Sequence, residues 1–163
     1  MIDARGPRFG AAITTVVLAA AVAIGPNTVG TALLAAQTVA FALGAIVGLH
    51  AQPYGVLFRR FVQPRLSGPT PLEAPQPPRF AQAVGLGFAA VALAGALSGT
   101  AIVFTVAASF ALAAAFLNAA FAFCLGCVIF AGLMRIRVIP QSVCLECADI
   151  SGRLAAAEAR QVA

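Results

Sequence analysis

The sequence predicts an all-α integral membrane protein with four transmembrane helices, arranged as two tandem helical hairpins. Of its 163 residues, 61% are hydrophobic and only 9% are charged, and the mean hydropathy is +0.98. A soluble fold of this length needs a polar exterior that such a composition does not supply. Four apolar stretches also approach the roughly 20 residues that a helix needs to cross a bilayer core of about 30 Å. The lipid bilayer is therefore the expected solvent of most of the chain.

The expected spans follow one another with short and long connections in alternation. They cover residues 9–25, 29–49, 80–97 and 101–123. The connections at residues 25–28 and 98–100 are short and uncharged, so each joins two spans into an antiparallel helical hairpin. We expect residues 1–134 to form the transmembrane domain and residues 135–163 to form a cytoplasmic tail that contains cysteines.

The basic residues determine the expected orientation. The chain contains no lysine, and the arginines near the spans all fall on one side of a four-span topology: Arg5, Arg8, Arg59, Arg60, Arg65, Arg79, Arg135 and Arg137. The positive-inside rule then places both termini and the central loop in the cytoplasm. These arginines flank membrane spans, so the net charge of +5 does not indicate nucleic-acid binding. The preference for Ala and Arg over Ile and Lys is typical of a GC-rich bacterial genome, and hence of a bacterial inner-membrane protein.

The amino terminus also has features of a cleaved signal peptide. Arg5 and Arg8 would form its basic region, and residues 21–23 (Ala-Val-Ala) resemble a cleavage site. Cleavage there would remove the first span and leave three, which conflicts with the even topology that the arginines indicate. We therefore expect the first span to be retained.

A short repeat suggests that the two hairpins are related. Residues 7–9 (Pro-Arg-Phe) recur as residues 78–80, in each case immediately before an apolar span, and the same offset places Pro53 on Cys124. Most other identities are Ala on Ala, so chance is an alternative to duplication. Duplicated units with an even number of spans would be parallel and related by an axis along the membrane normal.

Three segments outside the spans also carry local signals. Pro53 is expected to end or kink the second helix, and residues 54–61 form an amphipathic interfacial segment. Residues 67–78 are rich in proline and are expected to be an extended connector. A short helix is expected over residues 128–134.

The concentrated chemistry of the chain lies in two C-x-x-C units separated by sixteen residues, formed by Cys124, Cys127, Cys144 and Cys147. This spacing suits a structural site in which four thiolates bind zinc or iron. It also suits two dithiols that exchange disulfides. A third interpretation is that the cysteines are small buried apolar residues. Stable structural disulfides are disfavoured on the cytoplasmic side.

In the redox interpretation, Cys124 is the nucleophile and Cys127 its resolving partner, while Cys144 and Cys147 form an exchanging or carrier pair. Thiols at positions i and i+3 lie on one face of a helix and can close a disulfide. A helix amino terminus stabilises the thiolate and a carboxyl terminus opposes it. The outcome therefore depends on whether Cys124 opens the short helix or closes the fourth span, which the sequence leaves open.

Two further interpretations concern the spans. Asn118 lies inside the fourth span, and on an ideal helix it points roughly 120° away from Cys124, so we expect no catalytic role for it. Glycine-rich helix faces would also permit a pore, and a small permease subunit for a sulfur compound is therefore an alternative function.

The chain resembles a bacterial membrane-protein family labelled domain of unknown function 4395. The resemblance is carried by residues 5–9, 59–64 and 77–85, and most strongly by residues 117–127, which end in Phe-Cys-Leu-Gly-Cys. It covers the chain to about Met134 and implies that the Cys124–Cys127 unit is the family's signature. Genes for such proteins can lie near genes for thioredoxin-like or sulfurtransferase proteins, and the resemblance therefore implies partners of that kind.

Overall fold

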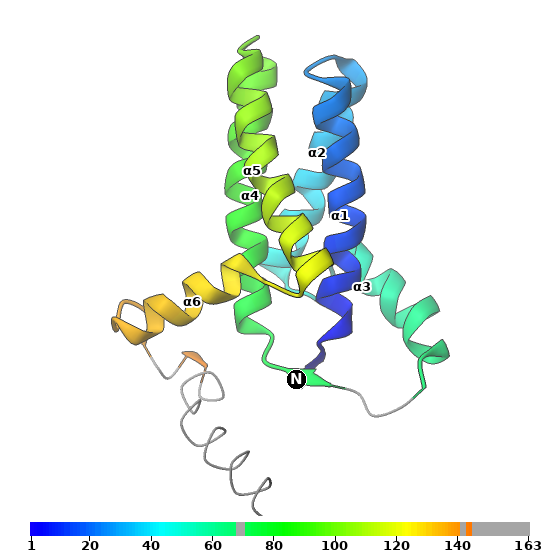
Figure 1. Ribbon diagram of the computed structural model, residues 1–163, viewed down its shortest axis with the longest axis vertical. Helices are drawn as coiled ribbons and strands as arrows, with labels where there is room; N and C mark the ends of the chain where they lie inside the picture. The colour runs from blue at the N-terminus through cyan, green and yellow to red at the C-terminus, as the bar shows by residue number, and fades with distance from the viewer. Residues whose placement is uncertain (68–70, 141–142, 145–163) are drawn as a thin grey trace, which may run out of the picture.

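The computed structural model describes residues 1–67, 71–140 and 143–144, and its main elements are four long helices (Figure 1). The long helices are α1 (Arg5–Ile24), α2 (Thr28–Ala42) with its π-helical continuation η1 (Leu43–Val47), α4 (Gln76–Leu97) and α5 (Ala101–Phe121). Each is long and apolar enough to cross a membrane. The prediction of an all-helical, multi-pass membrane protein is therefore confirmed.

The two connections at the far end of the bundle are built from residues that suit helix ends. Gly25 follows α1 with a φ of 80°, and Gly99 follows α4 with a φ of 72°, values that glycine adopts without strain. The Asn27 side chain caps α2 by accepting hydrogen bonds from the backbone N–H groups of Val29 and Gly30, both at 3.0 Å. These local signals allow each chain reversal to be completed in a few residues.

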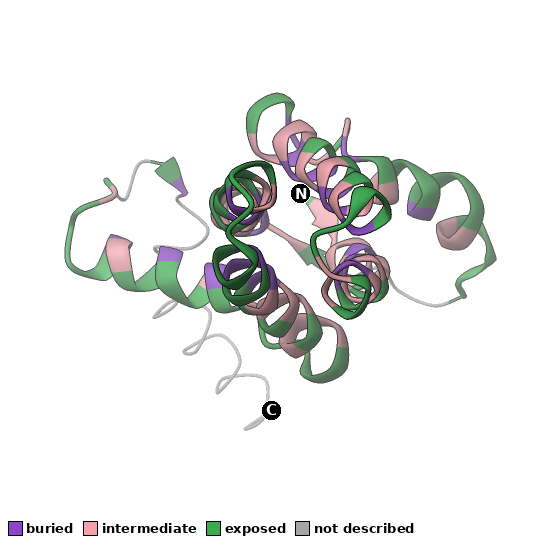
Figure 2. Cartoon of the chain, turned by 90° about the horizontal axis from the view of Figure 1, so that it is seen from above, coloured by how far each residue is buried: buried purple, intermediate pink, exposed green. Residues whose placement is uncertain are grey.

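The four long helices pack around a common centre, as the view along the bundle shows (Figure 2). Helix α1 contacts α2 and α5, and α4 contacts α5 and α2. Many of the buried residues between them are small, and the main cluster consists of Leu18, Leu34, Phe41, Ala89, Ala92, Phe104, Ala107, Ala108 and Ala111. Small residues allow helix backbones to approach closely, which is how helices associate in lipid. At Gly95, for example, an added Cβ would lie 2.7 Å from the backbone nitrogen of Phe104.

Short elements gather at the opposite end of the bundle, where the amino terminus also lies (Figure 1). Helix α3 (Pro53–Leu57) continues as η2 (Phe58–Val62) and η3 (Gln63–Arg65), and α6 (Leu125–Arg135) leaves the bundle on the other side. Strand β1 (Ile2–Asp3) pairs antiparallel with β2 (Leu72–Glu73), with Ile2 opposite Glu73. This strand pair ties the amino terminus to the segment that precedes α4.

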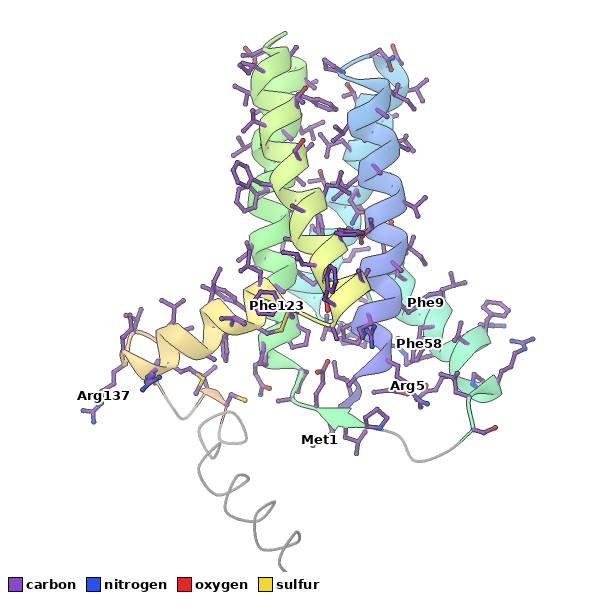
Figure 3. The ribbon with its side chains drawn as sticks, viewed as in Figure 1. Met1, Arg5, Phe9, Phe58, Phe123 and Arg137 are labelled. Carbon is purple, nitrogen blue, oxygen red and sulfur yellow. A yellow bond between two sulfur atoms is a disulfide. The ribbon has the colours of Figure 1, made fainter. Side chains whose placement is uncertain are left out.

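The two halves of the chain repeat one aromatic contact at this end. In the first half, Phe9 of α1 packs against Phe58 of η2 with ring centroids 5.7 Å apart (Figure 3). In the second half, Phe80 of α4 packs against Phe130 of α6 with centroids 5.6 Å apart. Both Phe9 and Phe80 belong to the repeated Pro-Arg-Phe tripeptide, so the repeated sequence makes an equivalent contact in each half.

The arginine of each tripeptide reaches across to the other half. Arg8 donates a hydrogen bond to the carbonyl oxygen of Ala119 in α5 at 3.4 Å. Arg79 donates to the carbonyl oxygens of Ala45 and Ile46 in η1, at 2.8 and 2.7 Å. Carbonyls near the end of a helix lack an intrahelical partner and carry partial negative charge. Each arginine therefore binds near the carboxyl end of a span from the opposite half.

Several boundaries differ from those expected. Helix α4 begins at Gln76, inside the proline-rich segment that was expected to be extended, because prolines in a first helical turn replace N–H groups that would have no partner. For the same reason, Pro53 does not end the second span but is the first residue of α3. Helix α6 is longer than the short helix expected over residues 128–134.

Candidate functional site

The candidate site is centred on the first C-x-x-C unit, at the junction of α5 and α6. The structure joins Cys124 and Cys127 by a disulfide, with their Cα atoms 5.2 Å apart. Both residues are partly buried. The residues at i and i+3 of one helical turn are therefore brought into bonding distance, as the spacing predicts.

The structure resolves where Cys124 lies relative to the two helices. Helix α5 ends at Phe121, because Ala122 adopts a left-handed conformation with a φ of 56°. The next helix begins at Leu125, and Cys124 is its N-cap, with an extended backbone and a side-chain sulfur that accepts a hydrogen bond from the Cys127 N–H at 3.3 Å. Cys124 thus opens α6 rather than closing the fourth span.

This position places Cys124 at the amino-terminal end of the α6 dipole. The first N–H groups of a helix point toward its N-cap and carry partial positive charge, which stabilises a thiolate there. The cation of α6, Arg135, lies in its last turn, where it complements the opposite end of the helix dipole. Of the two arrangements that the sequence left open, the structure therefore has the one that favours thiol chemistry.

Cys124 also lines a cavity of about 210 Å³ among the spans, which we call the cysteine cavity. Its walls come from α1, α2, α4, α5 and α6, and include Thr14, Phe41, Gln82, Gly85, Phe110 and Asn118. The expectation about Asn118 assumed one continuous helix from this residue to Cys124. Because α5 breaks at Ala122, both residues line the same cavity, and the helical-angle argument does not hold.

One buried polar atom at the cysteine cavity has no partner in the described part of the chain. The side-chain oxygen of Gln82 is buried and accepts no hydrogen bond. Gln82 packs against Gly44 of η1, where an added Cβ would lie 2.9 Å from the Gln82 side chain. An amide oxygen that is buried without a donor costs about 1–3 kcal/mol.

A second cavity, of about 270 Å³, lies toward the amino-terminal end of the molecule. It is lined by Asp3, Gln52 and Arg59, among others, and shares Pro7, Pro78 and Gln82 with the cysteine cavity. The two cavities are therefore neighbours on either side of the first turns of α1 and α4.

A buried polar network in the first half was not expected from the sequence. The Gln37 side chain is fully buried, and its Nε2 donates to Thr14 Oγ1 at 3.3 Å. The Tyr54 hydroxyl donates to Gln37 Oε1 at 2.8 Å. A glutamine inside an otherwise apolar span was the available signal, since such residues bind another helix when they face the bundle interior.

The second C-x-x-C unit is described only at Cys144. This residue is 2% exposed and packs with Phe130 and Met134 of α6, whereas Cys124 lies at the beginning of that helix. Cys147 lies outside the described residues. Within the described residues, no cysteine is a free thiol and no three His, Cys, Asp or Glu side chains gather where they could hold a metal ion. The predicted arrangement of four thiolates is therefore not tested.

Comparisons with known proteins place the chain in one family. A search of curated proteins and a search of solved structures each find no match. The family model described as "Domain of unknown function (DUF4395)" matches residues 2–135, a range that includes Cys124 and Cys127 and ends with α6. The resemblance identified from the sequence is confirmed, and the chain belongs to the family described as Domain of unknown function (DUF4395).

Proposed function

We propose that this protein is a bacterial inner-membrane protein whose Cys124–Cys127 pair carries out thiol–disulfide or sulfur-relay chemistry at the cytoplasmic face. The observation that carries the proposal is that Cys124 is the N-cap of α6 and is joined to Cys127. This combination supports a reactive dithiol, because a helix amino terminus stabilises the thiolate that attacks or leaves.

The orientation is supported by the arginines around this end of the bundle. Arg5 and Arg8 begin α1, Arg79 lies in the first turns of α4, and Arg135 ends α6. The turns at the opposite end of the bundle, at residues 25–27 and 98–100, carry no charge. The positive-inside rule therefore favours a cytoplasmic location for both termini and for the cysteine pair.

The exchange follows from the disulfide state. A substrate thiolate attacks the Cys124 sulfur, the Cys124–Cys127 bond breaks, and Cys127 leaves as a thiolate. A second substrate thiol then displaces Cys124, so that the substrate becomes a disulfide and the pair gains two electrons and two protons. In the sulfur-relay form, the Cys124 thiolate instead takes the outer sulfur of a donor persulfide, and the donor leaves as a thiolate. An acceptor thiolate then takes that sulfur as its own persulfide and releases the Cys124 thiolate.

A thioredoxin-like or sulfurtransferase protein would be the soluble partner, and Cys144 with Cys147 would form the pair that exchanges with the first. This assignment rests on the second C-x-x-C unit, which begins nine residues after the end of α6 in the sequence. It also rests on the packing of Cys144 against the helix that Cys124 caps.

We also infer that the two halves are copies of one two-span hairpin unit, related by an axis along the membrane normal. The equivalent Phe9–Phe58 and Phe80–Phe130 contacts support this inference. The reciprocal arginine contacts of Arg8 with α5 and of Arg79 with η1 support it as well, because exchange of the two halves converts one contact into the other.

The native intact mass of the full chain, purified anaerobically without added reductant, tests the proposal. We expect a mass lower by two hydrogens for each disulfide, restored by a thiol reductant. A mass raised by a metal ion would contradict the proposal in favour of a four-cysteine zinc or iron site. A fully reduced chain without metal would favour the permease alternative. In the same preparation, Cys127→Ser should trap a mixed disulfide between Cys124 and a partner.

A further inference from the structure

The difference between the halves explains why a cavity lies beside the cysteine pair. In the first half, Thr14, Gln37 and Tyr54 fill the space between α1, α2 and α3 with a hydrogen-bonded chain. At the offset of the repeated tripeptide, Thr14 and Gln37 fall on Gly85 and Ala108, which are both smaller, and Gly85 lines the cysteine cavity. The second half therefore leaves space where the first half has side chains.

The walls of the cysteine cavity suit a planar ring. Phe88 and Phe110 both line it and stack with centroids 5.8 Å apart and an interplanar angle of 23°. Aromatic side chains favour stacked contact with another ring. Both are also exposed on the outside of the bundle, by 37% and 59%, at residues of membrane-spanning helices. The cavity wall is thus shared with the surface that faces the hydrocarbon, from which a lipid-soluble molecule can approach.

Polar groups at the cavity suit the oxygens of such a ring. Gln82 and Asn118 line the cavity, and the N–H donors of their amides suit the carbonyl oxygen of a quinone. The cavity therefore offers hydrogen-bond donors within an apolar enclosure, as small-molecule sites usually do.

We propose that the cysteine cavity binds a membrane quinone, which exchanges two electrons with the Cys124–Cys127 pair. This inference rests on the proposed thiol–disulfide function and names the redox partner of the same site. Cys124, which lines the cavity, is the sulfur nearest the quinone, and Gln82 holds its oxygen.

The reaction balances between the two partners. Two S–H bonds of reduced Cys124 and Cys127 break and one S–S bond forms, while the two quinone carbonyls take up two electrons and two protons and become hydroxyls. A dithiol at a helix amino terminus has a stabilised reduced form and is therefore hard to oxidise by ordinary thiol exchange in a reducing cytoplasm. A lipid-soluble quinone supplies the oxidant from the membrane side.

The test uses the full chain in detergent, reduced with a thiol, freed of excess reductant and kept anaerobic. Decylubiquinone is then added, and both the quinol formed and the thiols lost are measured. We expect one quinol for each Cys124–Cys127 pair oxidised, and none from Cys124→Ser. Quinol formation by Cys124→Ser at the wild-type rate would overturn the proposal.

Two matched pairs of variants test whether the reaction uses the cavity. Ala114 lines the cavity and the adjacent Ala113 is exposed, so Ala114→Phe should slow quinol formation by about tenfold or more through steric exclusion, and Ala113→Phe should not. Gln82→Leu should slow it roughly three- to tenfold by removing hydrogen bonds. Gln76→Leu is the control, since its buried side-chain oxygen is also unpaired but does not line the cavity. Equal effects within each pair would overturn the assignment of the site.

A parallel reaction with oxidised glutathione separates the two proposals. A wild-type chain that exchanges with glutathione but does not reduce decylubiquinone would overturn the quinone site and leave the proposed function standing. A chain that reacts with neither would overturn both. A loss confined to the quinone reaction in Ala114→Phe supports the cavity as the quinone site.

Discussion

The two halves of this protein use one helix-capping geometry for different purposes. In the first half, the Gln52 side chain caps α3 by accepting a hydrogen bond from the Gly55 N–H at 2.7 Å. In the second half, the Cys124 sulfur caps α6 by accepting one from the Cys127 N–H at 3.3 Å. In each half the cap binds the third residue of the helix that it opens. The comparison teaches that the Cys124–Cys127 pair begins at a position that is a structural cap in the first half.

The interior of the bundle differs in the same way between the halves. The first half satisfies its buried polar groups within itself, through Thr14, Gln37 and Tyr54. The second half has Gly85 and Ala108 at the positions that match Thr14 and Gln37, and a cavity lined by the amides of Gln82 and Asn118 lies beside Cys124. One half is thus closed by hydrogen bonds, and the other keeps space and unused hydrogen-bonding capacity next to the sulfurs.

The largest expected effect comes from replacing each of the two helix caps, Cys124 and Gln52, by serine. Cys124→Ser should lower the rate of thiol exchange strongly, because the proposed nucleophile is lost, while serine still caps α6. The equivalent change in the first half, Gln52→Ser, should leave the exchange rate unchanged. The measurement is the rate of reaction with oxidised glutathione, with helix content checked by circular dichroism. Exchange at the wild-type rate in Cys124→Ser would place the reactive thiol elsewhere.

The next effect tests the closed interior of the first half. Gln37→Leu leaves Thr14 and Tyr54 without their partner, and should lower the free energy of unfolding by about 1–2 kcal/mol. In the second half, where Ala108 matches Gln37, the control is Phe110→Leu, which should cost less because Phe110 is 59% exposed. Thermal unfolding in detergent measures both. An equal loss of unfolding free energy in the two variants would show that the Gln37 hydrogen bonds add no stability beyond that of an exposed apolar side chain.

A smaller effect is expected from the two bridging arginines. Arg79 makes two hydrogen bonds of 2.7–2.8 Å to η1, whereas Arg8 makes one of 3.4 Å to α5. Arg79→Gln should therefore lower stability by about 1 kcal/mol, and Arg8→Gln by only a few tenths. The same unfolding assay compares them, and a larger effect of Arg8→Gln would reverse the proposed asymmetry.

The smallest effect concerns pH at the β1–β2 strand pair, which pairs the amino terminus with the segment before α4. The hydrogen bond from Arg5 lowers the pKa of Asp3 below 3.8, while burial, with the Asp3 charge adding to it, raises the pKa of Glu73 above 4.5. The lowered pKa of Asp3 stabilises the folded protein above pH 3.8, and this stabilisation is lost as the pH falls through the pKa that Asp3 has in the folded protein. The raised pKa of Glu73 stabilises the folded protein below pH 4.5, and this stabilisation is lost as the pH rises through the pKa that Glu73 has in the folded protein.

The strand pair should therefore be most stable near pH 4–4.5, between the two transitions. Hydrogen exchange of the Ala4 N–H, which donates to the Pro71 carbonyl at 2.9 Å, reports on it. Asp3→Asn should remove the loss of protection at low pH and bring the pKa of Glu73 closer to 4.5. Protection that falls steadily from pH 7 to pH 4 would contradict this assignment.

Much of the architecture could be predicted because its signals are local or compositional. The apolar stretches specify four spans, since only a bilayer is a good solvent for them. Gly25, Asn27 and Gly99 mark the short turns, and the repeated Pro-Arg-Phe marks the beginning of each half. The helix starts at Arg5 and Gln76 were placed too late, because charged and proline residues were assigned to the connections, although both are tolerated in a first helical turn.

The sequence by itself determined that this is a four-span membrane protein with a C-x-x-C unit after its last span. Only the tertiary structure decided where that unit lies relative to the helices and the cavity. Ala122 adopts a left-handed conformation that no local signal marks, since alanine usually continues a helix. This one residue ends α5 and lets Cys124 cap α6, so that Asn118 and Cys124 line the same cavity. The pairing of distant helices, which a linear pattern does not encode, places the sulfurs beside that cavity.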